Sequence, residues 1–139
     1  MPERREIGSL EARGLIAMVA DRLDANGQGA AVAVVDPHGE LVAFLRTDGC
    51  GLASINIAIH KAFTAARERV ESSVLEERSR TEGLPITNFG DSRYVGWGGG
   101  VPIMVAGEVI GAIGVSGLPE DADVELARWA ASTLAGATD

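Results

Sequence analysis

The feature that most constrains the fold is a pair of apolar runs around a turn, in the stretch AVAVVDPHGELVAFLRT (residues 31–47). Within DPHG, Asp stands first, Pro second and Gly fourth, as a type I turn prefers. The flanking runs therefore predict antiparallel strands near residues 30–36 and 41–47. A later stretch, VPIMVAGEVIGAIGVS, predicts a second hairpin, with Gly107 as the first central residue of a type II′ turn.

Helical patterns surround these hairpins. Apolar residues at helical spacing predict a helix that starts after Ser9 as N-cap and stops at NGQG, residues 26–29. Further helices are expected at 53–69, near 72–82 and, closing the chain, over DADVELARWAASTLAG. Hairpins rather than crossovers join the predicted strands. The chain is therefore expected to form an α+β fold with a mainly antiparallel sheet.

Length and composition limit the class of protein. The 139 residues suit a single domain, taken as residues 1–139, and the only cysteine, Cys50, cannot form an intramolecular disulfide. The first residues are charged and lack the apolar stretch of a secretory signal, so a cytoplasmic protein is expected. A formal net charge of −8 disfavours nucleic acid as a partner, and no apolar run reaches the ~18 residues of a membrane span.

The segment GWGGG contains glycines that a strand entry does not need. Gly98, Gly99 and Gly100 carry an entropic cost when ordered, which indicates either that a ligand or partner approaches their backbone or that the loop is flexible. The neighbouring Trp97 could stack on a planar ligand or anchor an interface.

Other residues of this region have structural interpretations. Gly111 and Gly114 interrupt the last predicted strand, where glycine permits bending or the close approach of another backbone. Glu120, Asp121 and Asp123 open the final predicted helix, where carboxylates complement the positive end of the helix dipole.

Five titratable residues are candidates for chemistry. His60 could ligate a metal or shuttle a proton, or it could be a satisfied helical histidine. Arg46 and Arg93 could each bind a carboxylate through the planar guanidinium. Lys61 and Asp48 are charged residues beside apolar or glycine-rich blocks. The alternative is that they form surface ion pairs, Arg46 with Asp48 and Lys61 with a carboxylate.

Three blocks, AVVDPHGELVAFLRTDG, IAIHKAFTAA and GGGVPIMVAGEVIGAIGVSG, together resemble the signature blocks of the haem-degrading family, also called GlcG/HbpS-like. They occur in the family's order over about residues 10–135. The resemblance implies a profilin-like α-β-α sandwich that forms homo-oligomers, dimers or larger. Some members bind or degrade haem, which makes haem a candidate cofactor. Leu118 departs from the pattern, which has a second glycine there.

The leading hypothesis is a small-molecule-binding protein with a pocket between helix 53–69, the GWGGG loop and a neighbouring subunit. The residues assigned to ligand binding are Arg46, Asp48, Arg93, Trp97, Gly98, Gly99 and Gly100. If haem binds, His60 is the candidate metal ligand, Arg46 or Arg93 the propionate partner and Trp97 the stacking wall. The family pattern fixes Lys61 and the TAA that follow, whereas position 60 varies in it. An aromatic content of only 4% favours a ligand smaller than haem.

Two alternatives belong to other classes. A cofactor-independent lyase or isomerase acting on a small aromatic or carboxylated metabolite would use His60 or Lys61 as general acid or base. A non-catalytic accessory subunit would use the glycines for oligomer packing and would have no pocket chemistry.

Overall fold

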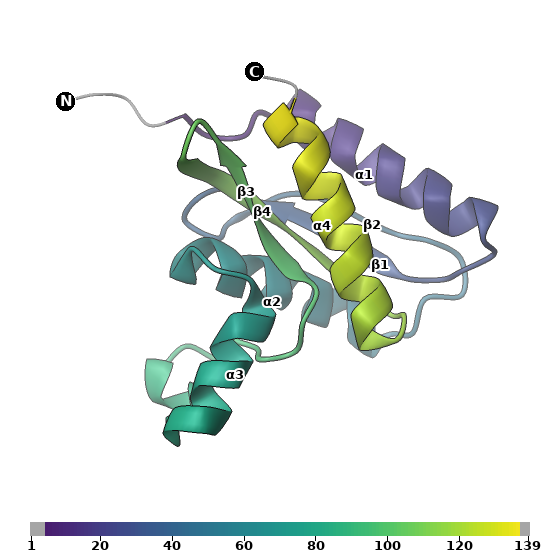
Figure 1. Ribbon diagram of the computed structural model, residues 1–139. Helices are drawn as coiled ribbons and strands as arrows, with labels where there is room; N and C mark the ends of the chain where they lie inside the picture. Colours follow the sequence, from purple (N-terminus) through teal and green to yellow (C-terminus); the bar gives the residue numbers. More distant parts are fainter. Residues whose placement is uncertain (1–4, 137–139) are drawn as a thin grey trace.

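The computed structural model describes residues 5–136, and its helices and strands follow the expected order (Figure 1). The elements are α1 (Ser9–Ala25), β1 (Ala31–Val35), β2 (Leu41–Arg46), α2 (Ala53–Glu68), α3 (Ser72–Glu82), the 3-10 helix η1 (Ile86–Phe89), β3 (Gly100–Val105), β4 (Glu108–Ser116) and α4 (Glu120–Gly136). The strands form one sheet in the order β2-β1-β4-β3, and all neighbours are antiparallel. The predicted α+β sandwich is confirmed.

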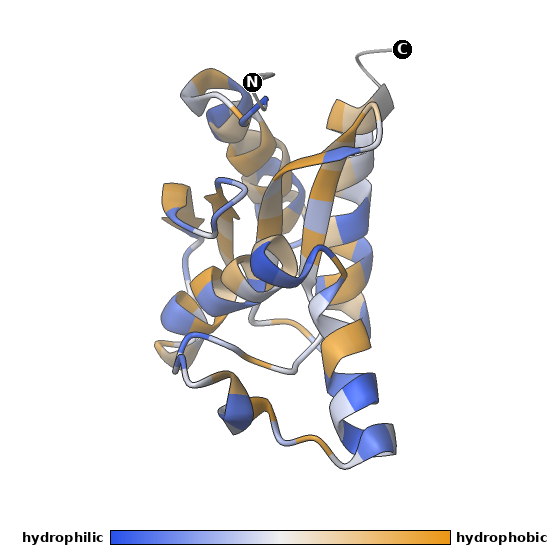
Figure 2. Ribbon diagram, turned by 90° about the vertical axis from the view of Figure 1, so that its left-hand side faces the viewer, coloured by the Kyte–Doolittle hydropathy of each residue, from blue (hydrophilic) through white to orange (hydrophobic). Residues whose placement is uncertain are grey.

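Helices cover both faces of the sheet. On one face, α1 packs on β1 and β2 while α4 packs on β3 and β4, and on the other face α2 crosses the sheet (Figure 1). Successive residues of β1 alternate between these two layers: Val32 and Val34 face α1 and α4, whereas Ala31 and Ala33 face α2. Figure 2 shows the result, with strands coloured mostly hydrophobic between helices that alternate in hydropathy.

Small residues bring α2 unusually close to the sheet. A Cβ added at Gly114 would lie 2.1 Å from the carbonyl oxygen of Ala58 and 2.7 Å from the backbone nitrogen of Ala62. Of the two interpretations considered for this glycine, bending and the close approach of another backbone, the second is confirmed. The backbone concerned is that of α2, whose buried face consists mainly of alanines.

One turn prediction is confirmed and one is wrong. In DPHG, the Gly39 N–H donates to the Asp36 carbonyl at 2.9 Å, as a β-turn requires. In the second hairpin the central residues are Ala106 and Gly107, with φ of 52° and 81°. Positive φ at both positions makes this a type I′ turn, because a type II′ turn has positive φ at its first central residue alone. The strand register pairs Val105 with Glu108, so Gly107 is the second central residue rather than the first.

The predicted ends of the first helix are partly correct. Its N-cap is Gly8 rather than Ser9, and the Gly8 N–H donates to the Glu11 carboxylate at 3.0 Å. The Glu11 carboxylate therefore satisfies the N–H of the N-cap residue, which is the glutamate half of a capping box, and the N-cap glycine supplies no side-chain acceptor. The helix ends at Ala25 with Asn26 as C-cap, as the NGQG motif predicted.

Candidate functional site

The chain has one lysine, and the fold buries it. Lys61 is only 2% exposed, and its Nζ donates to the Val115 carbonyl at 2.9 Å and to Asp123 Oδ2 at 3.2 Å. Asp123 is equally buried, and its Oδ1 accepts a hydrogen bond from the Leu118 N–H at 3.1 Å. The ion pair joins the middle of α2 to the first turn of α4 beside the end of β4.

Two interpretations from the sequence are corrected by this pair. The surface ion pair considered for Lys61 is wrong, because both charged groups lie in the interior. Asp123 does more than complement a helix dipole: burial raises the pKa of its carboxyl, while Lys61 and backbone N–H donors oppose that rise. A signal was present in the sequence, since Lys61 lies three residues after Ala58 and four before Ala65, on the apolar face of its helix.

Parts of the protein itself approach the glycine loop. The Gly98 N–H donates to Glu120 Oε2 at 2.7 Å. Gly99 has a φ of +126°, and a Cβ there would lie 2.6 Å from the Val115 carbonyl oxygen and 2.9 Å from Lys61 Nζ. A Cβ added at Gly100 would lie 2.1 Å from the Lys61 carbonyl oxygen. The glycines therefore make room for Lys61 and for the backbone of α2.

An open cleft of about 340 Å³ lies over this ion pair. Its lining comprises Ser54, Ile57, Lys61, Trp97, Ser116, Gly117, Leu118, Glu120 and Asp123. We call it the Lys61 cleft. Its volume falls within the range of small-molecule sites. The Trp97 side chain is 56% exposed, so its ring is accessible to a ligand.

Two polar groups of the Lys61 cleft have spare hydrogen-bonding capacity. An ammonium has three N–H donors, and Lys61 uses two of them on Val115 and Asp123. Ser116 is 5% exposed, and its hydroxyl forms no hydrogen bond with a backbone or side-chain atom of residues 5–136. A donor and a hydroxyl therefore remain for a bound molecule.

His60 and Arg93 lie together but do not line the Lys61 cleft. Partial burial lowers the pKa of the His60 imidazole, and the Arg93 charge lowers it further, so the neutral form is favoured near pH 7. Arg93 donates to Asp91 at 2.9 Å and to Glu40 at 3.0 Å, and its guanidinium lies 4.0 Å from the centroid of the Phe63 ring. Hydrogen bonds from Arg93 lower the pKa of Asp91 to about 2.

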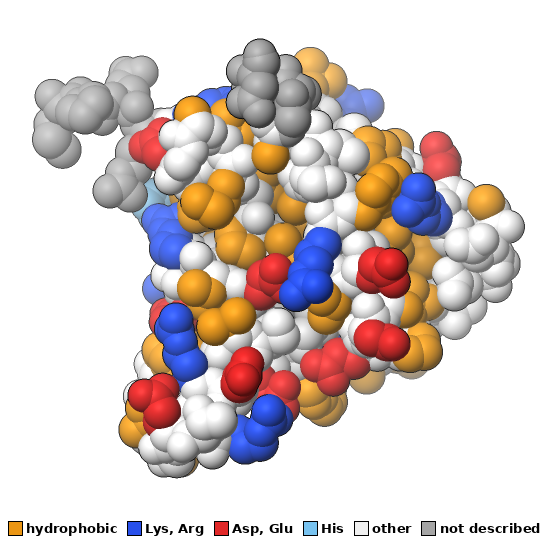
Figure 3. All heavy atoms as spheres, in the orientation of Figure 1, with side chains coloured by type: hydrophobic (Ala, Val, Ile, Leu, Met, Phe, Trp, Pro, Cys, Tyr) orange, Lys and Arg blue, Asp and Glu red, His pale blue; other side chains and the backbone are white. Residues whose placement is uncertain are grey.

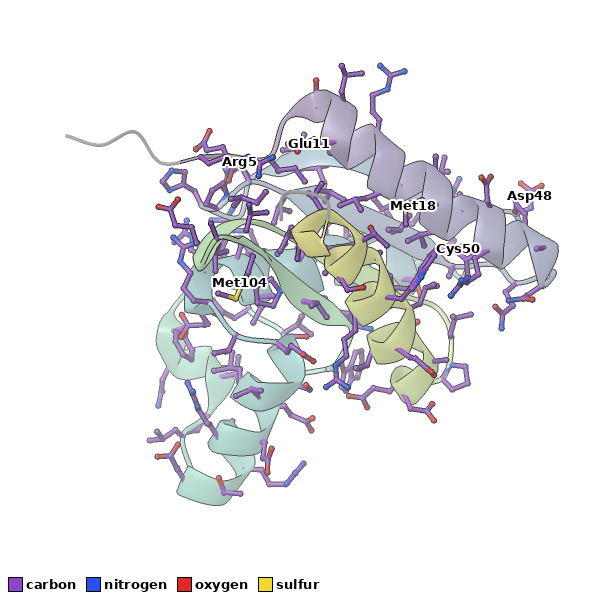
Figure 4. All side chains as sticks on the ribbon, turned by 45° about the horizontal axis from the view of Figure 1, so that its top comes forward. Arg5, Glu11, Met18, Asp48, Cys50 and Met104 are labelled. Carbon is purple, nitrogen blue, oxygen red and sulfur yellow. The ribbon has the colours of Figure 1, made fainter. Side chains whose placement is uncertain are left out.

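Arg46 and Asp48 are exposed at the end of β2 and do not line the Lys61 cleft. Figure 4 shows Asp48 and Cys50 at the opposite end of the sheet from Met104. Among the residues that the structure describes, no ion pair joins Arg46 to Asp48, so that alternative is wrong. Burial raises the pKa of the Cys50 thiol despite the nearby Arg46 charge, which agrees with an inert thiol.

The candidate residues thus fall into three places rather than one pocket. Lys61 and Trp97 line the cleft beside the glycine loop, His60 lies with Arg93, and Arg46 lies apart from both.

Between residues 5 and 136, no group of three or more His, Cys, Asp or Glu side chains could hold a metal ion. No helix in the same range has the length and hydropathy of a membrane span. Figure 3 shows acidic and basic side chains interspersed on the face drawn, without a basic patch.

Comparison with known proteins identifies the family. The family described as haem degrading protein HbpS-like matches residues 8–132. Protein GlcG of Escherichia coli is 35% identical over 130 residues, covering 89% of this chain and 91% of GlcG. A double mutant of Streptomyces reticuli HbpS superposes with a TM-score of 0.86 at 29% identity, covering 96% of this chain and 90% of that one.

A PduOC:heme complex also shares the fold, with a TM-score of 0.83 at 22% identity over 91% of this chain and 94% of the other. The HbpS-like match spans both hairpins and all of α2, including Lys61 and the glycine loop that surrounds it. This chain therefore belongs to the haem degrading protein HbpS-like family.

Proposed function

We propose that this protein binds a small molecule in the Lys61 cleft. The observation that carries the proposal is that one N–H of the buried Lys61 ammonium and the hydroxyl of Ser116, which both line the cleft, have no hydrogen-bond partner among residues 5–136. Ile57 and Leu118 add apolar surface, and Trp97 adds an exposed aromatic ring. Apolar walls with a few convergent polar groups are typical of ligand sites.

A fragment screen by NMR tests this proposal. The chain has two tryptophans, so a Trp129→Phe variant assigns the indole N–H resonance of Trp97. Fragments that bind should shift this resonance, and Ser54→Phe, which fills the cleft, should abolish the shift. The matched control Ser9→Phe, at an exposed position on α1, should preserve it. If no fragment shifts Trp97, or if Ser54→Phe has no effect on the shifts, the proposal fails.

Haem is a second candidate ligand, supported by the family description and by the heme-bound relative. The lining of the Lys61 cleft contains no histidine, cysteine, methionine or tyrosine to ligate iron. The His60 imidazole fits that role, because it is half-buried and favours the neutral form that binds metals. Arg93, beside it, would pair with a propionate. Haem, when bound, supplies a redox-active iron.

A haemin titration followed in the Soret band, with native mass spectrometry on the same sample, tests haem binding. A stoichiometric shift that His60→Ala removes is expected. The exposed His38 offers a matched control, and His38→Ala should leave the shift intact. Absence of a shift, or a shift that survives His60→Ala, would exclude this site for haem.

The acid–base alternative now depends on Lys61. A general acid or base must reach its substrate, and of the two candidates Lys61 lines the cleft whereas His60 does not. With a known substrate, a pH–rate profile that Lys61→Arg leaves unchanged would remove this role. The open cleft also disfavours a purely accessory subunit without a pocket.

A further inference from the structure

We propose that Lys61 forms a reversible imine with a small, uncharged aldehyde or ketone bound in the Lys61 cleft. This inference rests on the proposed function and adds to it both a covalent step and a ligand class. It follows from three features of the cleft, namely its single amine, the carboxylate that contacts that amine and the charge of the lining.

The amine is placed as imine-forming lysines are placed. Lys61 is the only lysine in the chain, it is buried, and it lines an open cleft. A buried lysine beside a group that can take its proton can act as a nucleophile towards a carbonyl. Gly99 and Gly100 keep side chains away from this amine, since a Cβ at Gly99 would lie 2.9 Å from Nζ.

The neighbouring groups can carry the protons that imine formation moves. Asp123 Oδ2, 3.2 Å from Nζ, takes one proton from the ammonium and frees the lone pair for attack on the carbonyl carbon. The Ser116 hydroxyl can donate to the carbonyl oxygen as it gains negative charge.

The carbinolamine then forms by transfer of a second proton from nitrogen to oxygen. Asp123 returns its proton to the hydroxyl, which leaves as water. Overall, one ammonium and one carbonyl give one protonated imine and one water, with no oxidant or reductant, and the imine stays paired with Asp123.

The charge of the cleft selects the ligand class. Its lining contains two carboxylates, Asp123 and Glu120, against the single cation of Lys61. The chain as a whole carries a formal charge of −8. The negative field of this partly desolvated site would repel a ligand carboxylate, whereas it would not repel an uncharged carbonyl compound.

Reductive trapping provides the test. The intact protein is treated with glycolaldehyde, which is uncharged, or with glyoxylate, its anionic counterpart, in the presence of cyanoborohydride. Peptide mass spectrometry then locates the reduced adducts. The α-amino group of the chain is an internal reference, because its lower pKa makes it the more reactive amine in an unfolded chain.

In the folded protein, glycolaldehyde should modify Lys61 faster than the α-amino group, and urea should reverse this order. For each aldehyde, the rate at Lys61 is divided by the rate at the α-amino group. This ratio should be about tenfold higher for glycolaldehyde than for glyoxylate. Ser116→Ala, which leaves the ion pair intact, should slow the reaction at Lys61 several-fold. In Lys61→Arg only the α-amino adduct should remain.

An unmodified Lys61 beside a modified α-amino group in the folded protein would overturn the imine. If fragments still shift the Trp97 resonance, noncovalent binding in the cleft stands and only the imine fails. If neither occurs, both proposals fail. Equal reaction of glyoxylate and glycolaldehyde at Lys61 would overturn the assignment of an uncharged ligand.

Discussion

Lys61 and Asp123 depend on each other for stability, because within residues 5–136 each is the other's only buried counter-charge. Lys61→Met leaves the Asp123 carboxylate without its cation and should lower the free energy of unfolding by about 3–5 kcal/mol. Urea denaturation measures this change. Lys61→Met combined with Asp123→Asn removes both charges and keeps an acceptor for the Leu118 N–H, so it should recover part of the loss. A stable single variant would show that Asp123 is not held as a buried anion.

Asp91 makes the stability depend on acid pH. Hydrogen bonds from Arg93 lower its pKa from 3.8 to about 2 in the folded protein. Because the folded value is below the unfolded one, the stabilisation is present above pH 3.8 and is lost as the pH falls towards 2. Asp91→Asn should therefore flatten the pH dependence of the unfolding midpoint in that interval. Parallel curves for the two proteins would contradict the assignment.

At the scale of elements, the seat of α2 on β4 depends on Gly114. Gly114→Ala would place a methyl group 2.1 Å from the Ala58 carbonyl oxygen, so α2 must move away from the sheet. We expect a loss of about 1–3 kcal/mol or more in chemical denaturation. The control is Gly14→Ala on the exposed side of α1, where the added methyl group meets no atom within 4 Å beyond its chain neighbours and the backbone of its own helix. It should raise stability by about 0.5–1 kcal/mol, because alanine is the better helix former.

For the whole molecule, self-association is the remaining prediction. β2 is an edge strand, and its Leu41 and Leu45 side chains are 49% and 41% exposed. Exposed apolar side chains on an edge strand favour contact with another chain. Light scattering after size exclusion should show an oligomer whose mass falls in a Leu41→Lys/Leu45→Lys variant. Leu10→Lys, on α1, is the control for added charge. An unchanged mass would place the contact elsewhere.

The architecture could be predicted from the sequence, because the signals for strands and helices are local. Two apolar runs around DPHG predicted β1 and β2. The glycine at 114 left two interpretations open, bending and the close approach of another backbone, and the position of α2 decides for the second. The type of the second turn was not determined, because the identity of the central pair depends on the register that two strands adopt together.

The site was decided by the tertiary structure. Lys61 and Asp123 are 62 positions apart, and the residue pattern of neither helix predicts that these two side chains form an ion pair. His60 and Lys61 are adjacent in sequence but diverge in space, since consecutive helical side chains point about 100° apart. Only the packing of α2 and α4 around β4 placed one lysine, one aspartate and a serine around the same cleft. Charge pairing and cavity shape depend on long-range contacts, whereas strand and helix formation depend on neighbours along the chain.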